Sequence, residues 1–487
     1  MDRPGRRTKI VATIGPASEG DTELRALLNA GVDVVRLNLA HGSPDEHVAT
    51  IGRVRALAAE RARPVGVLCD LPGPKIRTAA FPDGGVFLVE GNQVELVAAT
   101  DGGTSTDACI GVDYPDVCAD MAAGDQVTLG DGAIVLRVER CMPDRLLTRV
   151  VSGGRLQGRP GVHLPADRLR VSTPTAEDLQ LLEVAVGAGA DFIAISFVRT
   201  ADDVGQVRSA LAGVVAEGAH PVLVAKIETR TAVDNLDAIM DAADALMVAR
   251  GDLGTDYPIE EVPHLQKRIV RACVEWGRPV ITATQMLESM VNSPMPTRAE
   301  ASDVANAVFD GTDAVMLSAE TAIGRDPPHV VRTMARLVTR AEREASYVQW
   351  GSRLGRMQRR SPLDETLAIT AATTHAAWTA AVELAAKAIV CCTRSGLTAR
   401  AMARFRPPCL LLGCSYDERT VRQLTLSWGV LPLRVDFYES TDEMVWFSVE
   451  TLVRNGLAEH GDVAVVLAGA PEDEAPSTDV LRVVRIR

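Results

Sequence analysis

The segments 245-ALMVARG-251 and 279-PVITATQ-285 decide the fold of this chain. Each starts as a continuous apolar run and ends in polar residues, and the stretch between them, 262–277, has helical spacing. Runs that are apolar on both faces are typical of strands buried inside a parallel sheet. A strand, a helix and a second strand in this order predict a βαβ unit.

Six further runs have the same form, and helix-like segments such as 22–31 separate most of them. These runs are 9-KIVATIG-15, 32-VDVVRLNL-39, 64-PVGVLCDL-71, 191-DFIAISFV-198, 221-PVLVAKIE-228 and 314-AVMLSAE-320. Eight such units in series predict an α/β protein with a (β/α)8 TIM barrel.

Two regions do not fit the barrel pattern. Residues 79–170 read as short strands joined by Gly-Asp turns, which predicts an inserted β-barrel lid domain. After residue 346 a long Ala-rich helix over 363–387 precedes strand-like runs at 388–393, 409–415, 462–469 and 480–486. We therefore expect a catalytic barrel over 1–78 and 171–346, a lid over 79–170, and a C-terminal α/β regulatory domain over 347–487.

Composition excludes several classes of protein. The 487 residues carry a net charge of −13, which argues against a nucleic-acid-binding surface. The nine cysteines show no CxxC spacing, so we expect reduced core thiols rather than a zinc or disulfide framework. No signal-like or long uncharged apolar stretch occurs, which predicts a cytoplasmic protein without membrane contact.

Polar side chains gather where the predicted strands end. In a barrel of this kind the carboxyl ends of the strands form one rim, and active sites lie there. The rim residues are Arg36, Asn38, Asp70, Lys226, Glu228, Arg250, Asp252, Thr284, Ser318 and Glu320, and Arg77 follows the third strand. The sequence therefore predicts that a carboxylate pair and a basic cluster share one site.

The chemistry of this set favours phosphoryl transfer. Glu228 and Asp252 suit Mg²⁺, which takes one or two carboxylates and completes its shell with water and substrate oxygens. Arg36, Arg77 and Lys226 suit phosphate, because Arg forks match its oxygens and Lys supplies a point charge. A structural ion-pair network is the simpler alternative, although it does not explain charges on so many separate strands. No Walker A or Rossmann glycine motif is present, so a nucleotide would bind in another way.

Longer strings carry a family resemblance. KIVATIGPAS, VVRLNLAHG, LCDLPGPKIRT, AKIE, MVARGDLG, ITATQMLESM and PTRAEASDVANAVFDGTDAVMLSAET resemble pyruvate kinase, in that family's order. The resemblance covers nearly the whole chain and weakens over 79–160 and after 400. It implies a glycolytic transfer of the phosphoryl group of phosphoenolpyruvate to ADP, giving pyruvate and ATP. It also implies Mg²⁺, with Mn²⁺ as an alternative, and a homotetramer.

The resemblance implies roles for individual residues. Lys226 would stabilise the transferring phosphoryl group and the enolate, Glu228 and Asp252 would bind Mg²⁺, and Thr284 would lie beside the methylene carbon. The remaining implied roles are phosphate binding by Arg36 and Arg77, substrate binding by Gly251 and Ser318, nucleotide binding by Asn38, His41, Arg77 and the lid residue Asp131, and support of a neighbouring subunit's active-site loop by Arg298.

The site of a second cation departs from the family's pattern. The resemblance implies a K⁺ site near Asn38 and Asp70, but Ala40 stands in place of a serine ligand and Lys75 in place of a glutamate. Leu71 replaces a threonine, whose carbonyl is kept. A cage that loses an oxygen and gains an ammonium should not hold K⁺, and the ammonium of Lys75 can itself supply the positive charge in place of K⁺, so we expect a K⁺-independent enzyme. The alternative is that Lys75 points to solvent and K⁺ still binds.

Two further features concern nucleotides and regulation. Pro160 stands where the family has a lid lysine that contacts nucleotide phosphate, and Arg159 is a candidate substitute. The loop Thr393, Arg394, Ser395, Gly396 and Thr398 resembles the family's effector loop, although hydroxyls at a helix start also serve as simple caps. The acidic segment 469–479 favours an activating monophosphate, such as a sugar monophosphate or AMP, over a bisphosphate.

Two alternatives from other classes remain. A Mg²⁺-dependent aldolase or lyase barrel would explain Glu228 and Asp252 but not the inserted lid or the long strings. A non-catalytic regulatory paralogue would be expected to have lost Lys226, Glu228, Asp252 or Thr284, and all four are present. His375 and Trp378 are interpreted as packing residues rather than ligands.

Overall fold

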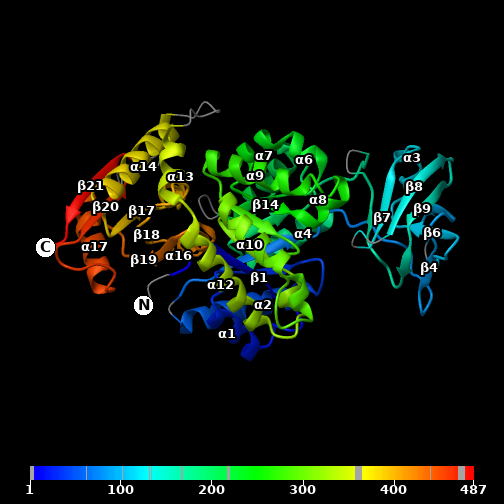
Figure 1. Ribbon diagram of the computed structural model, residues 1–487, viewed down its shortest axis with the longest axis horizontal. Helices are drawn as coiled ribbons and strands as arrows, with labels where there is room; N and C mark the ends of the chain where they lie inside the picture. The colour runs from blue at the N-terminus through cyan, green and yellow to red at the C-terminus, as the bar shows by residue number, and fades with distance from the viewer. Residues whose placement is uncertain are drawn as a thin grey trace.

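A closed barrel of parallel strands forms the centre of the computed structural model, with the C-terminal domain on one side and the lid on the other (Figure 1). The structure describes residues 5–61, 63–100, 103–130, 132, 134–165, 168–215, 220–356, 365–438, 440–469 and 478–487. The barrel strands are β1 (Lys9–Thr13), β2 (Val34–Asn38), β3 (Gly66–Leu71), β12 (Phe192–Ile195), β13 (Val222–Ile227), β14 (Ala245–Ala249), β15 (Val280–Ala283) and β16 (Ala314–Leu317). All eight predicted runs contribute, so the predicted (β/α)8 barrel is confirmed.

Helices cover the outside of the barrel. They are α1 (Asp21–Ala30), α2 (Pro44–Glu60), α4 (Ala176–Gly187), α5 (Ala201–Ala212), α6 (Arg230–Asp234), α7 (Leu236–Ala242), α9 (Val262–Trp276), α10 (Arg298–Asp310) and α12 (Pro327–Glu344). Ser43, Thr175 and Thr297 begin α2, α4 and α10 with capping boxes, in which the side chain accepts from the backbone three residues on. These caps fix where each helix leaves its βα loop.

Apolar side chains fill the barrel. Phe192, Met247 and Met316 belong to the cluster inside it, and Leu426 of the C-terminal domain joins the same cluster. Leu426 lies in the short helix η2 (Leu424–Leu426). The C-terminal domain therefore packs directly against the amino-terminal end of the barrel, whereas the chemistry was predicted at the opposite end.

The lid is β-rich, as predicted. Its larger sheet has the order β11 (Val162–His163), β7 (Gln126–Leu129), β8 (Ile134–Cys141), β9 (Leu146–Ser152), β5 (Gln93–Ala98) and β6 (Cys109–Val112). A second pair joins β10 (Gly154–Leu156) to β4 (Val86–Leu88), and one short helix, α3 (Val117–Asp120), is present. The lid has its own core, which includes Leu96, Val127 and Leu136.

The C-terminal domain contains a sheet of order β19 (Val430–Arg434), β18 (Leu410–Ser415), β17 (Ala388–Cys392), β20 (Val463–Ala468) and β21 (Val480–Arg485). Its helices are α13 (Tyr347–Arg356), α14 (Glu365–Glu383), α15 (Leu397–Ala403), α16 (Glu418–Gln423) and α17 (Thr441–Arg454). His375 and Trp378 stack near Phe405, which confirms their packing role. The acidic segment 469–479 lies almost entirely outside the described residues.

Some expectations of detail were wrong. The run 245–251 does not continue as strand, because α8 (Arg250–Asp256) begins directly after Ala249. All nine cysteines are free, but Cys141 is exposed rather than part of a core, since it ends a lid strand. Within the described residues, no helix has both the length and the apolar character needed to cross a membrane.

Candidate active site

Asp70 is the electrostatic centre of the rim. It lies near the end of β3 as a buried carboxylate, 1% exposed, and its Oδ2 accepts from Arg36 Nε and Nη2 at 2.7 Å each. Its Oδ1 lies 3.4 Å from Lys226 Nζ. These two cations outweigh the effect of burial and lower the pKa of Asp70. An ionised Asp70 therefore holds both predicted phosphate-binding cations in place.

Lys226 reaches the rim from β13 and meets a second carboxylate. Its Nζ lies 2.8 Å from Glu228 Oε1 and donates to Ser196 Oγ at 2.7 Å. Burial favours a neutral Lys226, but Asp70, Glu228 and Asp252 outweigh it and raise its pKa. Lys226 is therefore a permanent positive charge in a desolvated position, where such a charge acts most strongly.

Glu228 is buried, 2% exposed, and its Oε2 accepts from the backbone N–H of Phe197 at 2.7 Å. Burial, and after it the nearby Asp252, raise the pKa of Glu228, while Lys226 opposes the shift. Two carboxylates that repel one another favour a cation between them. Among the described residues no group of three or more His, Cys, Asp or Glu side chains could hold a metal. Glu228 and Asp252 lie close enough to form a two-carboxylate set. That set fits Mg²⁺, which fills its shell with substrate oxygens and water.

Thr284 follows β15 in an unusual conformation. Its φ is +66°, a left-handed value that is uncommon for a β-branched residue. Its hydroxyl accepts from the backbone N–H of Gly251 and donates to the carbonyl of Ala283, both at 2.7 Å. A strained residue held by its surroundings is typical of functional sites. Thr284 and the predicted substrate residue Gly251 are thus brought together.

Arg250 was predicted at the rim, but its side chain turns away from it. The guanidinium donates to the carbonyl of Thr284 at 2.6 Å and pairs with Asp303 of α10 at 2.6 Å. It also donates to the carbonyl of Ala283 at 3.2 Å. Arg250 therefore holds the Thr284 turn rather than the substrate.

The eighth strand supplies one candidate and one structural residue. Ser318 has a buried hydroxyl with no hydrogen-bond partner among the described atoms. Glu320 is fully buried and accepts from the backbone N–H groups of Ser318 and Leu287, at 2.7 and 3.0 Å. Glu320 is therefore a support of the rim and not part of its reactive surface.

The residues predicted to bind the nucleotide lie on the lid side of the rim and are more exposed. Arg77 lies where the lid begins and donates to the carbonyl of Arg159 at 3.2 Å. Arg159 pairs with Asp113 at 3.2 Å and is about half exposed, so it stands near Arg77 on the lid side. Partial desolvation, and then the cations Lys75, Arg77 and Arg36, lower the pKa of His41, which places it beside this basic edge. Asp131 lies outside the described residues.

Ser196 is a site residue that the sequence interpretation missed. Its hydroxyl bridges Lys226 Nζ and the carbonyl of Leu71, both at 2.7 Å. A signal was available, since Ser196 is the first polar residue after the fourth barrel strand, β12. The predicted rim residues included none from this strand or from the first strand, β1.

The predicted effector loop lies in the C-terminal domain beside a cavity of about 110 Å³. Thr393, Arg394, Ser395 and Thr398 line this cavity, and Gly396 N donates to Thr393 Oγ1 at 2.9 Å. The Thr398 hydroxyl is paired with Thr478 at 2.7 Å. The hydroxyls of Thr393 and Thr398 are therefore already hydrogen-bonded within the domain. Arg394 and Ser395 of the loop also line the small cavity.

The rim can bind an anion, neutralise charge on it and shield the reacting atoms. Buried cations next to a two-carboxylate set are suited to positioning a phosphoryl group and the charge that develops when it leaves. The unpaired hydroxyl of Ser318 adds a neutral polar group just after β16. The geometry of this arrangement is compatible with a lyase and with a kinase.

Comparisons with known proteins decide between them. Residues 5–331 match the family model "Pyruvate kinase, barrel domain", and residues 371–484 match "Pyruvate kinase, alpha/beta domain". A pyruvate kinase of Geobacillus stearothermophilus is 41% identical over 480 residues, which cover 98% of this chain and 80% of the relative. One of Agrobacterium vitis is 41% identical over 99% of both chains.

A solved structure supports the same assignment. The crystal structure of a pyruvate kinase from Cryptosporidium parvum superposes with a TM-score of 0.91 at 30% identity, covering 99% of this chain and 97% of that one. Family models that span most of the sequence, relatives at about 40% identity and a matching fold agree. The chain therefore belongs to the pyruvate kinase family of phosphotransferases.

Proposed function

We propose that the chain transfers the phosphoryl group of phosphoenolpyruvate to ADP at this rim, giving pyruvate and ATP, in a Mg²⁺-dependent reaction. The observation that carries the proposal is the buried Lys226 ammonium, held 2.8 Å from Glu228 and 3.4 Å from Asp70 and donating to Ser196. A fixed charge in this position stabilises the phosphoryl oxygens in transit and then the enolate oxygen.

The other residues have separate tasks. Arg36, fixed by Asp70, and Arg77 bind the phosphate before and after transfer, and the lid covers it so that water is excluded. Glu228 and Asp252 would hold Mg²⁺, which when bound would neutralise phosphate charge as a Lewis acid. Thr284 marks the side on which the enolate carbon receives its proton. Arg250 keeps Thr284 in that position through its carbonyl.

The test is the rate of pyruvate formation from phosphoenolpyruvate and ADP with Mg²⁺, in wild type and in Lys226→Met. Removing the charge should lower kcat about 100- to 1000-fold, as loss of one preorganised donor commonly does. Lys267→Met, an exposed lysine on α9, is the matched control and should keep the wild-type rate. A kcat that Lys226→Met leaves unchanged would contradict the proposal.

We propose further that the reaction needs no K⁺. The oxygens that would remain as K⁺ ligands are already engaged: Asp70 by Arg36, the Leu71 carbonyl by Ser196, and Asn38 Oδ1 by the N–H of Ala40 at 3.3 Å. Lys75 is exposed at the rim, yet partial desolvation and the nearby Arg77 and Lys226 lower its pKa, so its charge is felt within the site. Turnover in K⁺-free buffer that KCl does not increase is the expected result.

Regulation and assembly are extensions of the same proposal. The loop 393–398 and its cavity support activation by a sugar monophosphate or AMP. The stability of the wild type should rise with such a ligand, and the rise should disappear in Ser395→Ala/Thr398→Ala. A homotetramer is the proposed assembly and the cytoplasm the proposed compartment. Light scattering of the purified protein tests the assembly, and a mass of one or two chains would contradict it.

A further inference from the structure

A turn at the reactive rim also borders the two segments that join the barrel to the lid. It comprises residues 196–199, directly after β12 ends at Ile195, and we call it the β12 turn. Ser196 is buried in this turn, whereas Phe197 and Arg199 are half-buried. The turn is therefore placed to contact the rim on its inner side and the lid's connections on its outer side.

On its inner side the β12 turn holds Lys226 and Glu228. Ser196 Oγ accepts from Lys226 Nζ and donates to the carbonyl of Leu71, both at 2.7 Å. The backbone N–H of Phe197 donates to Glu228 Oε2 at 2.7 Å, while Glu228 Oε1 lies 2.8 Å from Lys226. One oxygen of Glu228 is thus fixed by the turn and the other by the lysine.

The backbone of Phe197 is strained. Its φ is +55°, in the left-handed region that a bulky side chain seldom adopts. Such a conformation persists only where the surroundings enforce it, and it occurs mostly at functional sites. Here it accompanies an N–H that points at Glu228, a carboxylate that is 2% exposed. The strain therefore has an identifiable result, which is the direction of this hydrogen bond.

The outgoing linker, residues 72–75, leaves the barrel beside the β12 turn. It contains Gly73, whose φ of +66° is also left-handed. A methyl group added at Gly73 would lie 3.0 Å from Phe197 Cδ2 and 3.0 Å from Ser196 Cβ, which is tighter than ordinary van der Waals contact. The N–H of Gly73 donates to Asp178 Oδ1 at 2.9 Å, which holds the glycine in place. The outgoing linker is therefore packed directly against the turn.

The returning linker, residues 168–173, passes Arg199. The Arg199 guanidinium donates to the carbonyls of Leu169 and Val171, at 2.9 and 2.6 Å, and both of these residues pack against the core of the lid. The backbone of Arg199 is itself fixed, because its N–H donates to Asp203 at 2.7 Å and its carbonyl accepts from Asn235 at 3.0 Å. The β12 turn therefore holds the lid on its way out of the barrel and on its way back.

A simple connection between β12 and α5 is the blander explanation of this turn. The capping contacts of Asp203 with the N–H groups of Arg199 and Thr200 fit that explanation. The left-handed backbone of Phe197 and the contacts with both linkers do not, because a connection to α5 needs neither of them.

We propose that the β12 turn is a positioning element that sets the carboxylate of Glu228 through the strained backbone of Phe197 and couples it to the lid's linkers. The inference rests on the proposed function, which assigns Glu228 to the metal. A change at the outgoing linker is transmitted to the carboxylate through the packing of Gly73 against Phe197. The turn thus joins the position of the lid to the geometry of the rim.

Binding of Mn²⁺ to the full chain without substrate, measured by electron paramagnetic resonance, tests the turn separately from turnover. Phe197→Val should weaken Mn²⁺ binding about 10- to 100-fold, because a β-branched side chain resists the left-handed backbone and the N–H leaves Glu228. Phe197→Gly should bind Mn²⁺ within about 3-fold of wild type, because glycine adopts this conformation freely. Weaker binding in Phe197→Gly than in Phe197→Val would assign the effect to the ring and overturn the backbone role.

A pair of glycine variants tests the coupling to the outgoing linker. Gly73→Ala presses a methyl group against the turn and should weaken Mn²⁺ binding about 10-fold. Gly84→Ala is the matched control, because Gly84 has a φ of +96° in the lid and no described atom lies within 4 Å of an added methyl group. It carries a similar backbone strain and should leave Mn²⁺ binding unchanged. Equal Mn²⁺ affinity of the two variants would overturn the coupling.

Arg199→Met tests the returning linker. It removes two hydrogen bonds to linker carbonyls and keeps the backbone contacts of Arg199, so hydrogen exchange over residues 168–173 should quicken and KM for ADP should rise about 10-fold. Arg208→Met is the control, because Arg208 of α5 donates to a backbone carbonyl away from the linker, that of Ala242. Unchanged exchange over residues 168–173 in Arg199→Met would overturn the role of Arg199.

Glu228→Gln separates the inference from the proposed function. Mn²⁺ binding that Glu228→Gln abolishes but Phe197→Val and Gly73→Ala leave intact would overturn the inference and keep the proposed metal site. Mn²⁺ binding that Glu228→Gln does not weaken would overturn the metal assignment, and the inference with it. Thermal unfolding of each variant shows that it is folded at the temperature of the titration. If Phe197→Val does not fold, the comparison of Gly73→Ala with Gly84→Ala decides.

Discussion

At the scale of residues, one buried carboxylate, that of Asp70, orients the cations of the reactive rim. Asp70 binds Arg36 through two nitrogens and stands 3.4 Å from Lys226, so one buried charge orients both cations. Glu228 and Ser196 hold Lys226 from its other sides. Because each partner is itself fixed by a strand end, the site is built before substrate arrives.

Restoring the lost cation ligands should restore a need for K⁺. The double variant Ala40→Ser/Lys75→Glu adds an oxygen and exchanges an ammonium for a carboxylate, so its rate in K⁺-free buffer should fall at least 10-fold and recover with KCl. The measurement is kcat against KCl concentration, with tetramethylammonium chloride as the ionic-strength control. The kcat of Lys75→Met should not depend on KCl: it should either stay at the wild-type value or fall without recovering when KCl is added. KCl activation of the wild type would contradict the role assigned to Lys75.

Lys9 should give the fold a distinct pH dependence. Its pKa is about 8 in the folded chain, below its ordinary value of 10.5, so the unfolded chain binds more protons between these values. Stability should therefore rise with pH across that window. Relative to Lys9→Met the burial cost is about 3 kcal/mol below pH 8 and shrinks toward pH 10.5.

The measurement for Lys9 is the difference in Tm between Lys9→Met and wild type at pH 7 and at pH 9.5, in buffer free of phosphate and nucleotides. We expect Lys9→Met to be the more stable at pH 7 and its advantage to narrow at pH 9.5. Lys267→Met, which alters an exposed lysine, should show no such trend. A gap that widens with rising pH would contradict the sign of the shift.

The candidate site shows what sequence reveals at this scale. Lys226, Glu228 and Asp70 were predicted because strand ends of a parallel barrel must meet at one rim. Arg250 was predicted to face the same rim, but its side chain turns to Asp303 of α10. Strand position gives a residue's level in the barrel, whereas the direction of a long side chain depends on partners from distant segments. The domain boundaries, the metal and the individual roles stay predictions.

Elements were predicted where their patterns are strong. The eight barrel runs are continuous and apolar, and each became a strand, although most end before their polar tail. β19 was missed, because Pro432 interrupts its short run and removes a backbone donor. β19 lies at the edge of its sheet, where such a loss is tolerated. Its parallel pairing with β18, which no local pattern encodes, is what defines it.

The stability of helix α10 depends on the hydrogen bonds of its first turn. Thr297 accepts from Glu300 N, and the Glu300 carboxylate accepts from the N–H of Thr297 and from Ser289, which ties the preceding loop to the helix. Thr297→Ala should lower stability by about 1 kcal/mol and Tm by about 2 °C. Differential scanning calorimetry checks this, and Thr297→Ser should retain most of the wild-type Tm. An equal loss of Tm in Thr297→Ala and Thr297→Ser would show that the methyl group of Thr297, and not its capping hydroxyl, stabilises the protein.

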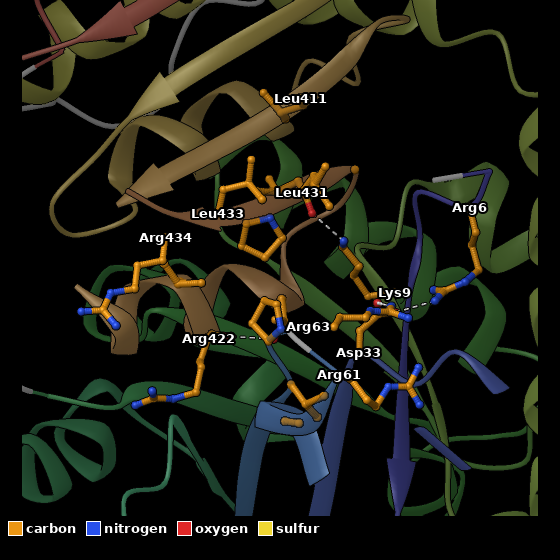
Figure 2. Close-up of a pocket in the computed structure, with 18 of the residues that line it drawn as sticks. Arg6, Lys9, Asp33, Arg61, Arg63, Leu411, Arg422, Leu431, Leu433 and Arg434 are labelled. Atoms are coloured by element: carbon orange, nitrogen blue, oxygen red, sulfur yellow. Dashed lines mark hydrogen bonds and ion pairs between the residues drawn. The ribbon is translucent and has the colours of Figure 1, made fainter. Parts of the chain in front are cut away.

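The whole molecule joins an acidic surface to basic interior clefts. Cations gather at both ends of the barrel: Arg36 and Lys226 lie at the rim beside buried carboxylates, and Lys9 and Arg61 line a cavity next to the C-terminal domain (Figure 2). The net charge of −13 comes from the rest of the chain. Anionic substrates should therefore bind where the fold concentrates cations, and their binding at the rim should weaken as the salt concentration rises.

A buried ion pair connects the barrel to the C-terminal domain. Arg406 is 1% exposed, and its guanidinium lies 2.9 Å from Asp313, donates to the carbonyl of Gly311 at 2.5 Å, and covers the ring of Trp428. Removing one member of such a pair leaves an uncompensated charge. Arg406→Met should therefore destabilise the protein by about 3–5 kcal/mol.

A double variant distinguishes the loss of the Arg406–Asp313 ion pair from the loss of the packing of the Arg406 side chain. Arg406→Met/Asp313→Asn removes both charges, so it should be more stable than Arg406→Met alone, even though it carries one more substitution. Thermal unfolding of both variants, with Arg419→Met on α16 as the control, gives the comparison. Faster hydrogen exchange over residues 428–434 should accompany the single variant, because this segment leaves the barrel when the pair is broken. A double variant that is less stable than the single one would mean that Asp313 holds the domain junction through its bonds to the backbone of Val280 and Trp428 rather than through Arg406.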